Sequence, residues 1–226
     1  MSVFSAFEII GPPMTGPSSS HTAGAVRIGL AARALLGTEP ADAQIALHGS
    51  FAATGAGHAT DRALVAGLLN WPPDDARLKD ALTWAGQQNL HVVFQTVDLG
   101  EDVHPNSARL VISSAEEKTS CTVTASSIGG GSIEILTIDG FTARVDGCLV
   151  TLVMWHKDRP GFLSKITTLL ACAAINIATI RTTRKGREGE ALTLVETDEA
   201  IPDDCRSLLG RLPEISRLRE IPRLVF

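Results

Sequence analysis

Residues 149–174, LVTLVMWHKDRPGFLSKITTLLACAA, contain a strand, a loop and a helix in succession. The first seven residues are almost all apolar, which is typical of a strand buried on both faces. KDRPG, residues 157–161, combines charges with Pro and Gly and predicts a loop. The segment from Phe162 to Ala174 is predicted to be a helix, because its apolar residues return at helical spacing. Those residues are Leu163, Ile166, Leu170 and Ala173.

The sequence that follows completes a pattern of two helices and four strands. The further predicted elements are a strand at 177–183, a turn at 185–187, a strand at 191–197, a helix that begins at Pro202-Asp203-Asp204 and a closing strand at 218–226. The order βαββαβ is that of the ferredoxin-like fold. We therefore expect residues 148–226 to form a ferredoxin-like domain.

Residues 1–147 follow a different pattern, with helices first and strands later. The predicted elements are a loop at 11–22, a helix at 23–36 ended by Gly37, a strand at 45–48, a glycine-rich loop at 49–58, helices that start at Thr60 and Asp74, and strands at 91–97, 108–113, 119–125 and 132–138. Asp139-Gly140 predicts a two-residue hairpin turn after the last strand. The first module is thus expected to be α+β, with a mainly antiparallel sheet.

Charge is distributed unevenly along the 226 residues, whose net charge is −5. Residues 1–148 carry 8 basic and 15 acidic groups, whereas residues 149–226 carry 12 and 10. This difference supports two modules, which we place at 1–147 and 148–226. An acidic first module and the absence of Tyr argue against nucleic-acid binding.

Segments that would direct the chain to a membrane or an oxidising compartment are not expected. Residues 1–10 lack a basic residue and include Glu8, unlike a signal peptide. The longest uncharged apolar stretch, residues 166–180, is shorter than the roughly 20 residues that span a bilayer. The four cysteines are 24 to 33 residues apart, without a CxxC pair. This spacing predicts no metal site in this chain and favours a reducing, cytoplasmic location.

The second module resembles an ACT domain, a βαββαβ unit that in many relatives binds an amino acid where two copies pair. The resemblance lies in DRPG, residues 158–161, and in Ile175-Asn176-Ile177 at the next strand. Gly161 would let the backbone approach a ligand, and the helix N-terminus beyond it would offer free N–H groups to a carboxylate. The resemblance implies homodimeric pairing and a set of ligand-binding residues. These are Asp158, Arg159, Pro160, Gly161 and Asn176. A module that only dimerises, with sensing lost, is the alternative.

Five short motifs of the first module resemble the β subunits of iron–sulfur-dependent L-serine dehydratases. They are GPSSSHT (16–22), HGSFA (48–52), GHATD (57–61), HPN (104–106) and SIGGG (127–131). Together with the ACT-like module, the resemblance covers nearly the whole chain. One position departs from the family, which usually has Gly where Ala59 stands. We expect the methyl group of Ala59 to tighten the loop beside His58.

The resemblance implies conversion of L-serine to pyruvate and ammonia, in serine catabolism and gluconeogenesis. In this family the β module is similar to the allosteric substrate-binding domain of some D-3-phosphoglycerate dehydrogenases. Catalysis there requires an α subunit whose cysteines hold a [4Fe–4S] cluster. The implied partners are therefore the α subunit, L-serine and a second copy of this chain, and the implied cofactor is the cluster of the α subunit.

Dehydration of serine requires an anchor for the carboxylate, a base for the Cα proton and a Lewis acid for the hydroxyl. Hydroxyl and N–H groups of the serine-rich loop ahead of helix 23–36 suit the anchor. For the base we place His58 first and His21 second, because both precede predicted helix starts, where the dipole favours a neutral imidazole. His48, at a strand end, is expected to orient the loop at Ser50. The predicted substrate-binding residues are Ser18, Ser19, Ser20, Thr22, His48, Ser50, Thr60 and Asp61.

A non-catalytic, amino-acid-binding regulator built from the same two modules is the alternative function. The hydroxyls and histidines of residues 18–22 and 57–61 favour the enzyme, since a sensor would need only the ACT ligand loop. A related hydroxy-amino acid as substrate stays open, because the partner can supply the wall of the pocket that faces the side chain.

Overall fold

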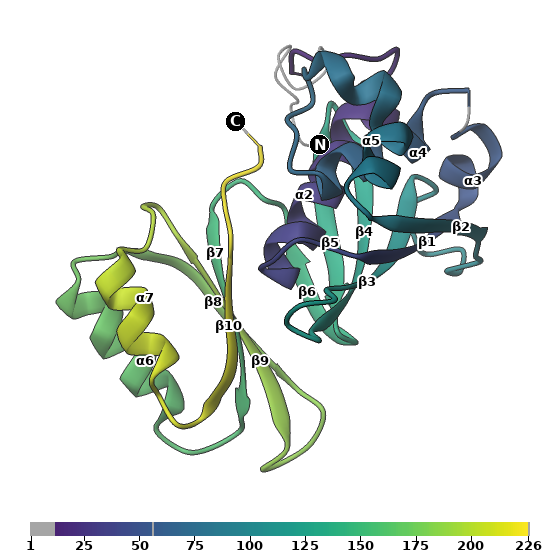
Figure 1. Cartoon of the computed structure of the whole chain (residues 1–226). Coiled ribbons are helices and arrows are strands. Elements are labelled where there is room, and N and C mark those ends of the chain that lie inside the picture. The colour runs from purple at the N-terminus through teal and green to yellow at the C-terminus, as the bar shows by residue number, and fades with distance from the viewer. Residues whose placement is uncertain (1–11, 56, 226) are drawn as a thin grey trace, which may run out of the picture.

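The structure of this chain is a computed structural model that describes residues 12–55 and 57–225. Two α+β units are visible, each built on one β-sheet (Figure 1). The predicted division between residues 147 and 148 falls between β6 (Phe141–Val145), the last strand of the first sheet, and β7 (Val150–Lys157), in the second. The predicted α+β class is confirmed.

The first sheet has six strands in the order β2-β1-β3-β4-β5-β6. Besides β6 they are β1 (Asp42–His48), β2 (His91–Thr96), β3 (Ser107–Ser113), β4 (Ser120–Gly129) and β5 (Ser132–Ile138). β1 and β2 pair in parallel, and the other neighbouring strands are antiparallel. Asp139 and Gly140 join β5 to β6 with φ angles of 48° and 79°. Two positive φ values are what a type I′ hairpin turn requires, so the predicted hairpin is confirmed.

The helical elements of the first unit pack on one another and on this sheet, with α2 against both β4 and α4. They are the π-helical turn η1 (Ser19–Gly24), α2 (Ala25–Leu36), α3 (Gly49–Thr54), α4 (Thr60–Leu68), the 3₁₀ turn η2 (Ala76–Asp80) and α5 (Ala81–Gln87). Gly37 ends α2 with a left-handed φ of 84°, as predicted.

Two predicted loops are partly helical. The prediction for residues 49–58 is wrong over its first six residues, which form α3. The ring of Phe51 is fully buried, and the backbone N–H of the same residue donates to Pro105 O at 3.3 Å. These tertiary contacts outweigh the preference of glycine for loops. The prediction for residues 11–22 is wrong at its end, because helical structure begins at Ser19 with η1.

The second sheet confirms the predicted βαββαβ order. Its strands lie in the order β10-β7-β9-β8, with α6 and α7 on one face (Figure 1). The remaining elements are α6 (Phe162–Cys172), β8 (Ile177–Arg184), β9 (Glu190–Thr197), α7 (Asp203–Gly210) and β10 (Ile215–Ile221). The closing strand is shorter than predicted, because Pro222 has no N–H with which to extend the ladder. The buried face of α6 also differs, since Phe162 is buried whereas Leu163 is 43% exposed.

The face of the second sheet opposite α6 and α7 packs against the first unit. Val153 and Trp155 of β7, with Leu192 and Leu194 of β9, belong to the same buried cluster as the core of the first unit. Leu152 and Met154, which alternate with them along β7, lie instead in a second cluster beneath α6 and α7. The strand β7 therefore supplies both of its faces to hydrophobic cores, as its apolar sequence predicted.

None of the helices in the described ranges is both long and apolar enough to cross a membrane. The expectation for residues 1–10 and the end of the predicted closing strand at Phe226 lie outside the described residues.

Candidate functional site

The short motifs of the first unit converge near the start of α2. Pro105, in the HPN motif, accepts a hydrogen bond from the N–H of Phe51 at 3.3 Å. Gly49 fits against the same proline, because a Cβ there would lie 2.7 Å from Pro105 O. Asn106 O accepts the N–H of Ser127 at 2.8 Å. The HPN segment thus joins the HGSFA motif to the SIGGG motif.

The SIGGG motif packs against η1 and α2. Gly24 faces the side chain of Ser127, and a Cβ on Gly24 would collide with it. Arg27, which is 4% exposed, donates from Nη1 to Gly131 O at 2.5 Å. A Cβ on Gly131 would lie 2.8 Å from that same nitrogen. The glycine at 131 therefore makes room for a buried guanidinium that holds the loop.

His21 lies at the centre of a group of hydroxyls. Its Nε2 is 3.2 Å from Thr54 Oγ1 and 3.3 Å from Ser50 Oγ. Its Nδ1 is 3.5 Å from the Oγ of Ser18, which also accepts the backbone N–H of His21. The ring is half-buried and packs edge-on against Phe51. The motifs around residues 18 and 50 are therefore brought together by this imidazole.

His58 lies beside His21, with 4.9 Å between the ring centroids. Its Nδ1 is 3.1 Å from the backbone carbonyl of Thr54. Because a carbonyl oxygen only accepts, Nδ1 carries the proton of the neutral imidazole and Nε2 carries the lone pair. This tautomer presents Nε2 as a proton acceptor, which is what a general base requires.

The pKa of His21 is lowered from its ordinary value, chiefly by burial and further by the charge of His58, while a hydrogen bond at Ser50 opposes the shift. The sequence analysis attributes a neutral imidazole at His21 and His58 to the dipole of a helix that begins just after each residue. For His21 that prediction is wrong, because the residue lies inside η1. His58 does precede a helix, α4, which begins at Thr60. Burial, rather than the helix dipole, therefore favours neutral His21.

Ala59 has a left-handed backbone, with φ 59° and ψ 29°, directly ahead of α4. Glycine adopts this conformation without steric cost, whereas a Cβ makes it unfavourable. A Gly at this position, as the resemblance implies for the family, would fit this geometry, and the strain of Ala59 lies beside His58.

Several predicted substrate-binding residues have unused hydrogen-bonding capacity. Thr22 Oγ1, Thr60 Oγ1 and Asp61 Oδ1 are buried and have no partner within the described part of the chain, and the same holds for Oγ of Ser127, which was not among the predicted residues. Leaving such a group unpaired costs about 1–3 kcal/mol. Ser19 and Ser20 are half-buried in η1. Ser19 and Ser20 are therefore partly open to solvent, whereas Thr22, Thr60 and Ser127 are fully enclosed by the chain.

His48 contacts a segment other than the predicted one. Its Nδ1 accepts the N–H of Leu99 at 3.2 Å and lies 3.9 Å from Asp98. The imidazole thus holds residues 97–99, after β2, and no contact of its side chain with Ser50 is found among the described residues. The side chain of His104 makes a hydrogen bond within its own HPN motif, because its Nδ1 accepts the N–H of Asn106 at 3.1 Å.

Thr54 and Arg27 are site residues that the sequence analysis missed. Thr54 contacts both histidines, His21 through Oγ1 and His58 through its carbonyl oxygen. Ser50, Thr54 and His58 are spaced four residues apart, which places the first two on one face of α3. That spacing would have indicated Thr54 if residues 49–54 had been predicted as a helix. Arg27 gave no such signal, because its partner is 104 residues away.

The predicted ACT ligand residues lie apart in a single chain. Asp158 pairs with Arg184 at 2.8 Å, and this hydrogen bond lowers the pKa of Asp158. Asn176 donates to Asp198 at 2.6 Å. Arg184 ends β8 whereas Asn176 directly precedes it, so one chain places these residues at opposite ends of a strand. Gly161 has φ 82° and open space where a Cβ would stand. Pro160 is exposed, and Arg159 faces a hollow of about 180 Å³ with Glu214.

The four cysteines are all free and lie in separate places. Cys121 is in β4, Cys148 in the connection between the sheets, Cys172 at the end of α6 and Cys205 in α7. In the described ranges, no three His, Cys, Asp or Glu side chains are placed to hold a metal ion together. This donor set does not fit a [4Fe–4S] cluster.

The fold and the site define a two-unit protein, in which an α+β unit with paired histidines and clustered hydroxyls is joined to a βαββαβ domain. The family model described as ACT domain matches residues 150–213. The model described as Serine dehydratase beta chain matches residues 2–136. The chain belongs to the serine dehydratase β-chain family.

Curated relatives agree with this assignment. The chain is 41% identical over 217 residues to a probable L-serine dehydratase, beta chain, of Bacillus subtilis, which covers 96% of this chain and 97% of the relative. It is 39% identical to an L-serine dehydratase, beta chain, of Peptoniphilus asaccharolyticus, over 92% and 94% of the two chains. A D-3-phosphoglycerate dehydrogenase of Synechocystis is 30% identical over 43% of this chain and 17% of its own length.

Proposed function

We propose that this chain is the β subunit of a two-chain L-serine dehydratase that converts L-serine to pyruvate and ammonia. The observation that supports it most is the contact of Thr54 with two histidines, in a chain that belongs to the serine dehydratase β-chain family. The two β-chain relatives, of Bacillus subtilis and Peptoniphilus asaccharolyticus, bear this activity in their names. A site with one half-buried, neutral imidazole and one free Nε2 suits the removal of a Cα proton.

In this proposal His58 Nε2 accepts the Cα proton of serine. The fixed tautomer at Thr54 O makes His58 the better candidate than His21, whose Nε2 faces two hydroxyls. Loss of the Cα proton and the β-hydroxyl gives water and 2-aminoacrylate, whose imine tautomer hydrolyses to pyruvate and ammonia. His21 positions the hydroxyls of Ser50 and Thr54 beside the substrate.

The carboxylate of serine is assigned to η1. Ser18, Ser19 and Ser20 begin this turn, and Thr22 lies within it with an unpartnered, buried hydroxyl. Thr60 and Asp61 offer the same kind of buried oxygen at the start of α4, where Asp61 suits the substrate ammonium. The wall that faces the substrate side chain is left to the partner, which keeps related hydroxy-amino acids open as substrates.

The partner in this proposal is a cytoplasmic α subunit that holds the [4Fe–4S] cluster and supplies the Lewis acid for the departing hydroxyl. The cysteines of this chain do not fit that group, so no part of the cluster is assigned to it. Homodimeric pairing through the ACT domain completes the assembly.

A non-catalytic, amino-acid-binding regulator is the second candidate function. The ACT domain supports it, because such a domain suffices for sensing. The pairing of His21 with His58 favours the enzyme, since a sensor has no need of a proton acceptor.

Anaerobic pyruvate formation from L-serine tests the proposal, with this chain alone and with its α subunit carrying a reconstituted cluster. Activity is expected only in the mixture. His58→Gln should lower kcat about 10³-fold, whereas His91→Gln, on the exposed side of β2, should leave it unchanged. No turnover by an assembled, cluster-loaded mixture would favour the regulator, and normal turnover by His58→Gln would remove His58 as the base.

Thr54→Val separates the two roles of Thr54. Valine keeps the carbonyl that fixes His58 and removes the hydroxyl beside His21 Nε2. We expect kcat to fall about tenfold, the effect of one hydrogen bond. Thr96→Val, in the exposed end of β2, is the matched control. An unchanged kcat would show that the hydroxyl is structural only.

A further inference from the structure

A hollow of about 280 Å³ lies beside α2, on the side that carries Arg27 and Leu30. Two pairs of prolines also line it, one ahead of the GPSSSHT motif and the other after α4. They are Pro12, Pro13, Pro72 and Pro73. The segment that follows β10 contributes Arg223 and Leu224. Among the described residues, none that is predicted to bind serine or an ACT ligand takes part in this lining.

The apolar part of the lining is open to a ligand and is held in place. Leu30 and Pro73 are only half-buried, so their side chains keep accessible surface. The loop after α4 is fixed by Thr15, whose N–H donates to Pro73 O at 2.9 Å. The segment after β10 is fixed by Leu224, whose N–H donates to Gly147 O at 2.9 Å. The hollow is therefore preformed, as small-molecule sites usually are.

Arg27 brings a buried positive charge to this hollow. The residue is 4% exposed, and its Nη1 donates to a neutral acceptor, Gly131 O, at 2.5 Å. Its Nε is buried, without a partner in the described part of the chain. Burial lowers the pKa of this guanidinium from its ordinary value, and no carboxylate of the described residues opposes the shift. Buried charges in proteins are ordinarily paired, so the described chain leaves this cation without a counter-ion.

Arg223 adds a second guanidinium, on a residue that is exposed. Its Nε donates to Val225 O at 3.2 Å, and its two terminal nitrogens have no acceptor among the described residues. The lining also includes Asp74, an exposed residue that makes no ion pair with either arginine within the described ranges. Two guanidiniums and one carboxylate leave the lining with an excess of positive charge. A guanidinium with free terminal nitrogens suits a carboxylate, which it can hold through two parallel hydrogen bonds.

We propose that this hollow binds a small monocarboxylate with an apolar body. The carboxylate would pair with the terminal nitrogens of Arg223 and lie beside Arg27, whose buried charge it would compensate. The apolar body would pack on Leu30 and the prolines. An amino acid is less suited, because its ammonium would bring a further positive charge beside two guanidiniums. The volume of about 280 Å³ is near the lower end for small-molecule sites, which restricts the ligand to a small body.

Calorimetric titration of the full chain with 4-methylpentanoate tests this proposal. Saturable binding of one molecule is expected, and 4-methylpentanamide, which has the same shape without the charge, should bind about tenfold more weakly. Arg223→Gln should weaken binding of the carboxylate by about the same factor. Arg211→Gln, at the exposed end of α7, is the matched control and should leave the affinity unchanged. Both arginines are exposed, so the variants are expected to fold, and their thermal melts check it.

Asp74→Asn is expected to have the opposite effect. The variant keeps the backbone carbonyl that accepts the Thr15 hydroxyl at 3.1 Å, and it removes a negative charge from the lining. The monocarboxylate should therefore bind about threefold more tightly. A misfolded variant would only lose affinity, so opposite changes in Asp74→Asn and Arg223→Gln identify the charges of the hollow as the cause.

The proposal fails if 4-methylpentanoate gives no saturable heat, if the amide binds equally well, or if Arg223→Gln leaves the affinity unchanged. Excess L-serine should not displace the ligand, since displacement would place the carboxylate at η1 instead. Binding that occurs only in Glu8→Gln, or only in a chain extended past Phe226, would also overturn the proposal, because a carboxylate of the chain itself would then occupy the hollow. None of these measurements requires the α subunit or serine turnover, so their failure leaves the proposed function untouched.

Discussion

At the scale of single residues, the candidate site contains a residue whose backbone conformation is unfavourable for its own side chain. Ala59 is held in the left-handed region directly beside His58, although a Cβ disfavours that region. Two backbone hydrogen bonds hold Ala59 in this conformation. The N–H of Thr60 donates to Gly55 O at 2.9 Å, and the N–H of Ala63 donates to Ala59 O at 2.9 Å. The first turn of α4 thus imposes the strain.

Ala59→Gly relieves this strain, and the free energy of unfolding is expected to rise by up to about 1 kcal/mol. Urea denaturation of the chain measures it. Ala171→Gly, near the exposed C-terminal end of α6, serves as the control and should lower stability by up to about 1 kcal/mol, because that site is helical. A loss of stability in both variants would show that Ala59 is not strained.

The pH dependence of stability follows from a second buried histidine, His156. It is 4% exposed, with Nδ1 2.9 Å from Lys157 O and Nε2 2.8 Å from Thr193 Oγ1. Burial, the largest cause, lowers the pKa of His156 below its ordinary value of 6.5. The folded chain then binds fewer protons than the unfolded chain, so this contribution to stability is complete above pH 6.5 and is lost as the pH falls below it.

Denaturant titrations at pH 7.5 and 5.5 check this prediction. The wild-type chain should be less stable at the lower pH, and His156→Gln should show a smaller difference between the two. His91→Gln, an exposed residue, should retain the full difference. An undiminished difference in His156→Gln would assign the acid sensitivity to other groups, such as His21.

At the scale of elements, sequence patterns predicted every strand of both sheets except β6, which they indicated only through its hairpin turn. Local signals sufficed for the strands, because the alternation of apolar residues and the turn residues are each evident within a few consecutive positions. They failed at α3 and η1, where burial of Phe51 and contacts with distant segments decide the conformation. The site was found through motifs, yet Thr54 becomes visible only once residues 49–54 are known to be helical, and Arg27 only when residues far apart in the sequence are brought together.

The loop between β4 and β5 offers a test of such a distant contact. Gly131→Ala would place a Cβ 2.8 Å from Arg27 Nη1 at φ 81°, whereas Gly140→Ala, at φ 79°, meets open space. The two variants share the backbone strain, so their difference isolates the collision. We expect Gly131→Ala to be less stable than Gly140→Ala by about 1–3 kcal/mol. Equal losses would show that the buried arginine adjusts freely.

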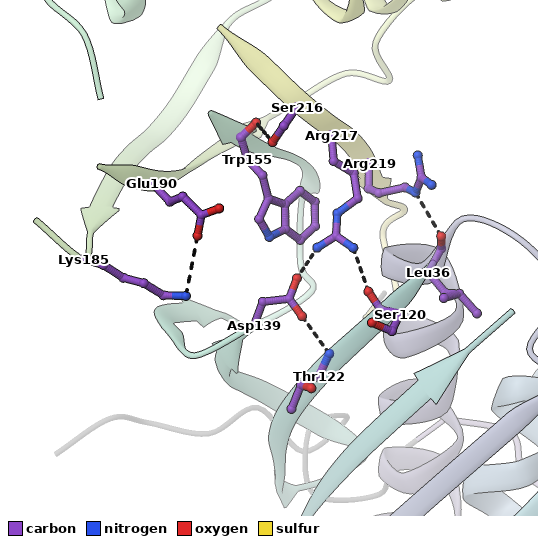
Figure 2. A network of polar contacts seen from close by, with 10 residues as sticks. All are labelled: Leu36, Ser120, Thr122, Asp139, Trp155, Lys185, Glu190, Ser216, Arg217 and Arg219. Atoms are coloured by element: carbon purple, nitrogen blue, oxygen red, sulfur yellow. Dashed lines mark hydrogen bonds and ion pairs between the residues drawn. The ribbon is translucent and has the colours of Figure 1, made fainter. Parts of the chain in front are cut away.

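At the scale of the whole molecule, the two units are joined by apolar packing and by a small number of charged contacts. Arg219 of β10 donates to Leu36 O at the end of α2, at 3.1 Å. Arg217, two residues earlier on the same strand, pairs with Asp139 at the hairpin of the first sheet (Figure 2). One strand of the second unit therefore anchors a helix and a hairpin of the first.

The contribution of the Arg217–Asp139 pair is measurable because its side chains are only 19% and 24% exposed. Arg217→Met keeps most of the length that covers Trp155, and Asp139→Asn tolerates the positive φ of the turn. Each substitution should lower the free energy of unfolding by about 1–3 kcal/mol, because it leaves a partly buried partner unpaired.

A double-mutant cycle decides whether the two side chains act on each other. The double variant should lose less than the sum of the single losses, with a coupling of about 1 kcal/mol or more. Arg144→Met and Glu134→Asn, a more exposed pair at 3.5 Å, provide the comparison and should couple by less than about 0.5 kcal/mol. If the losses of unfolding free energy at Arg217 and Asp139 add without coupling, the apolar cluster of Trp155 and its neighbours holds the units together. The two charges would then contribute nothing to each other's stability.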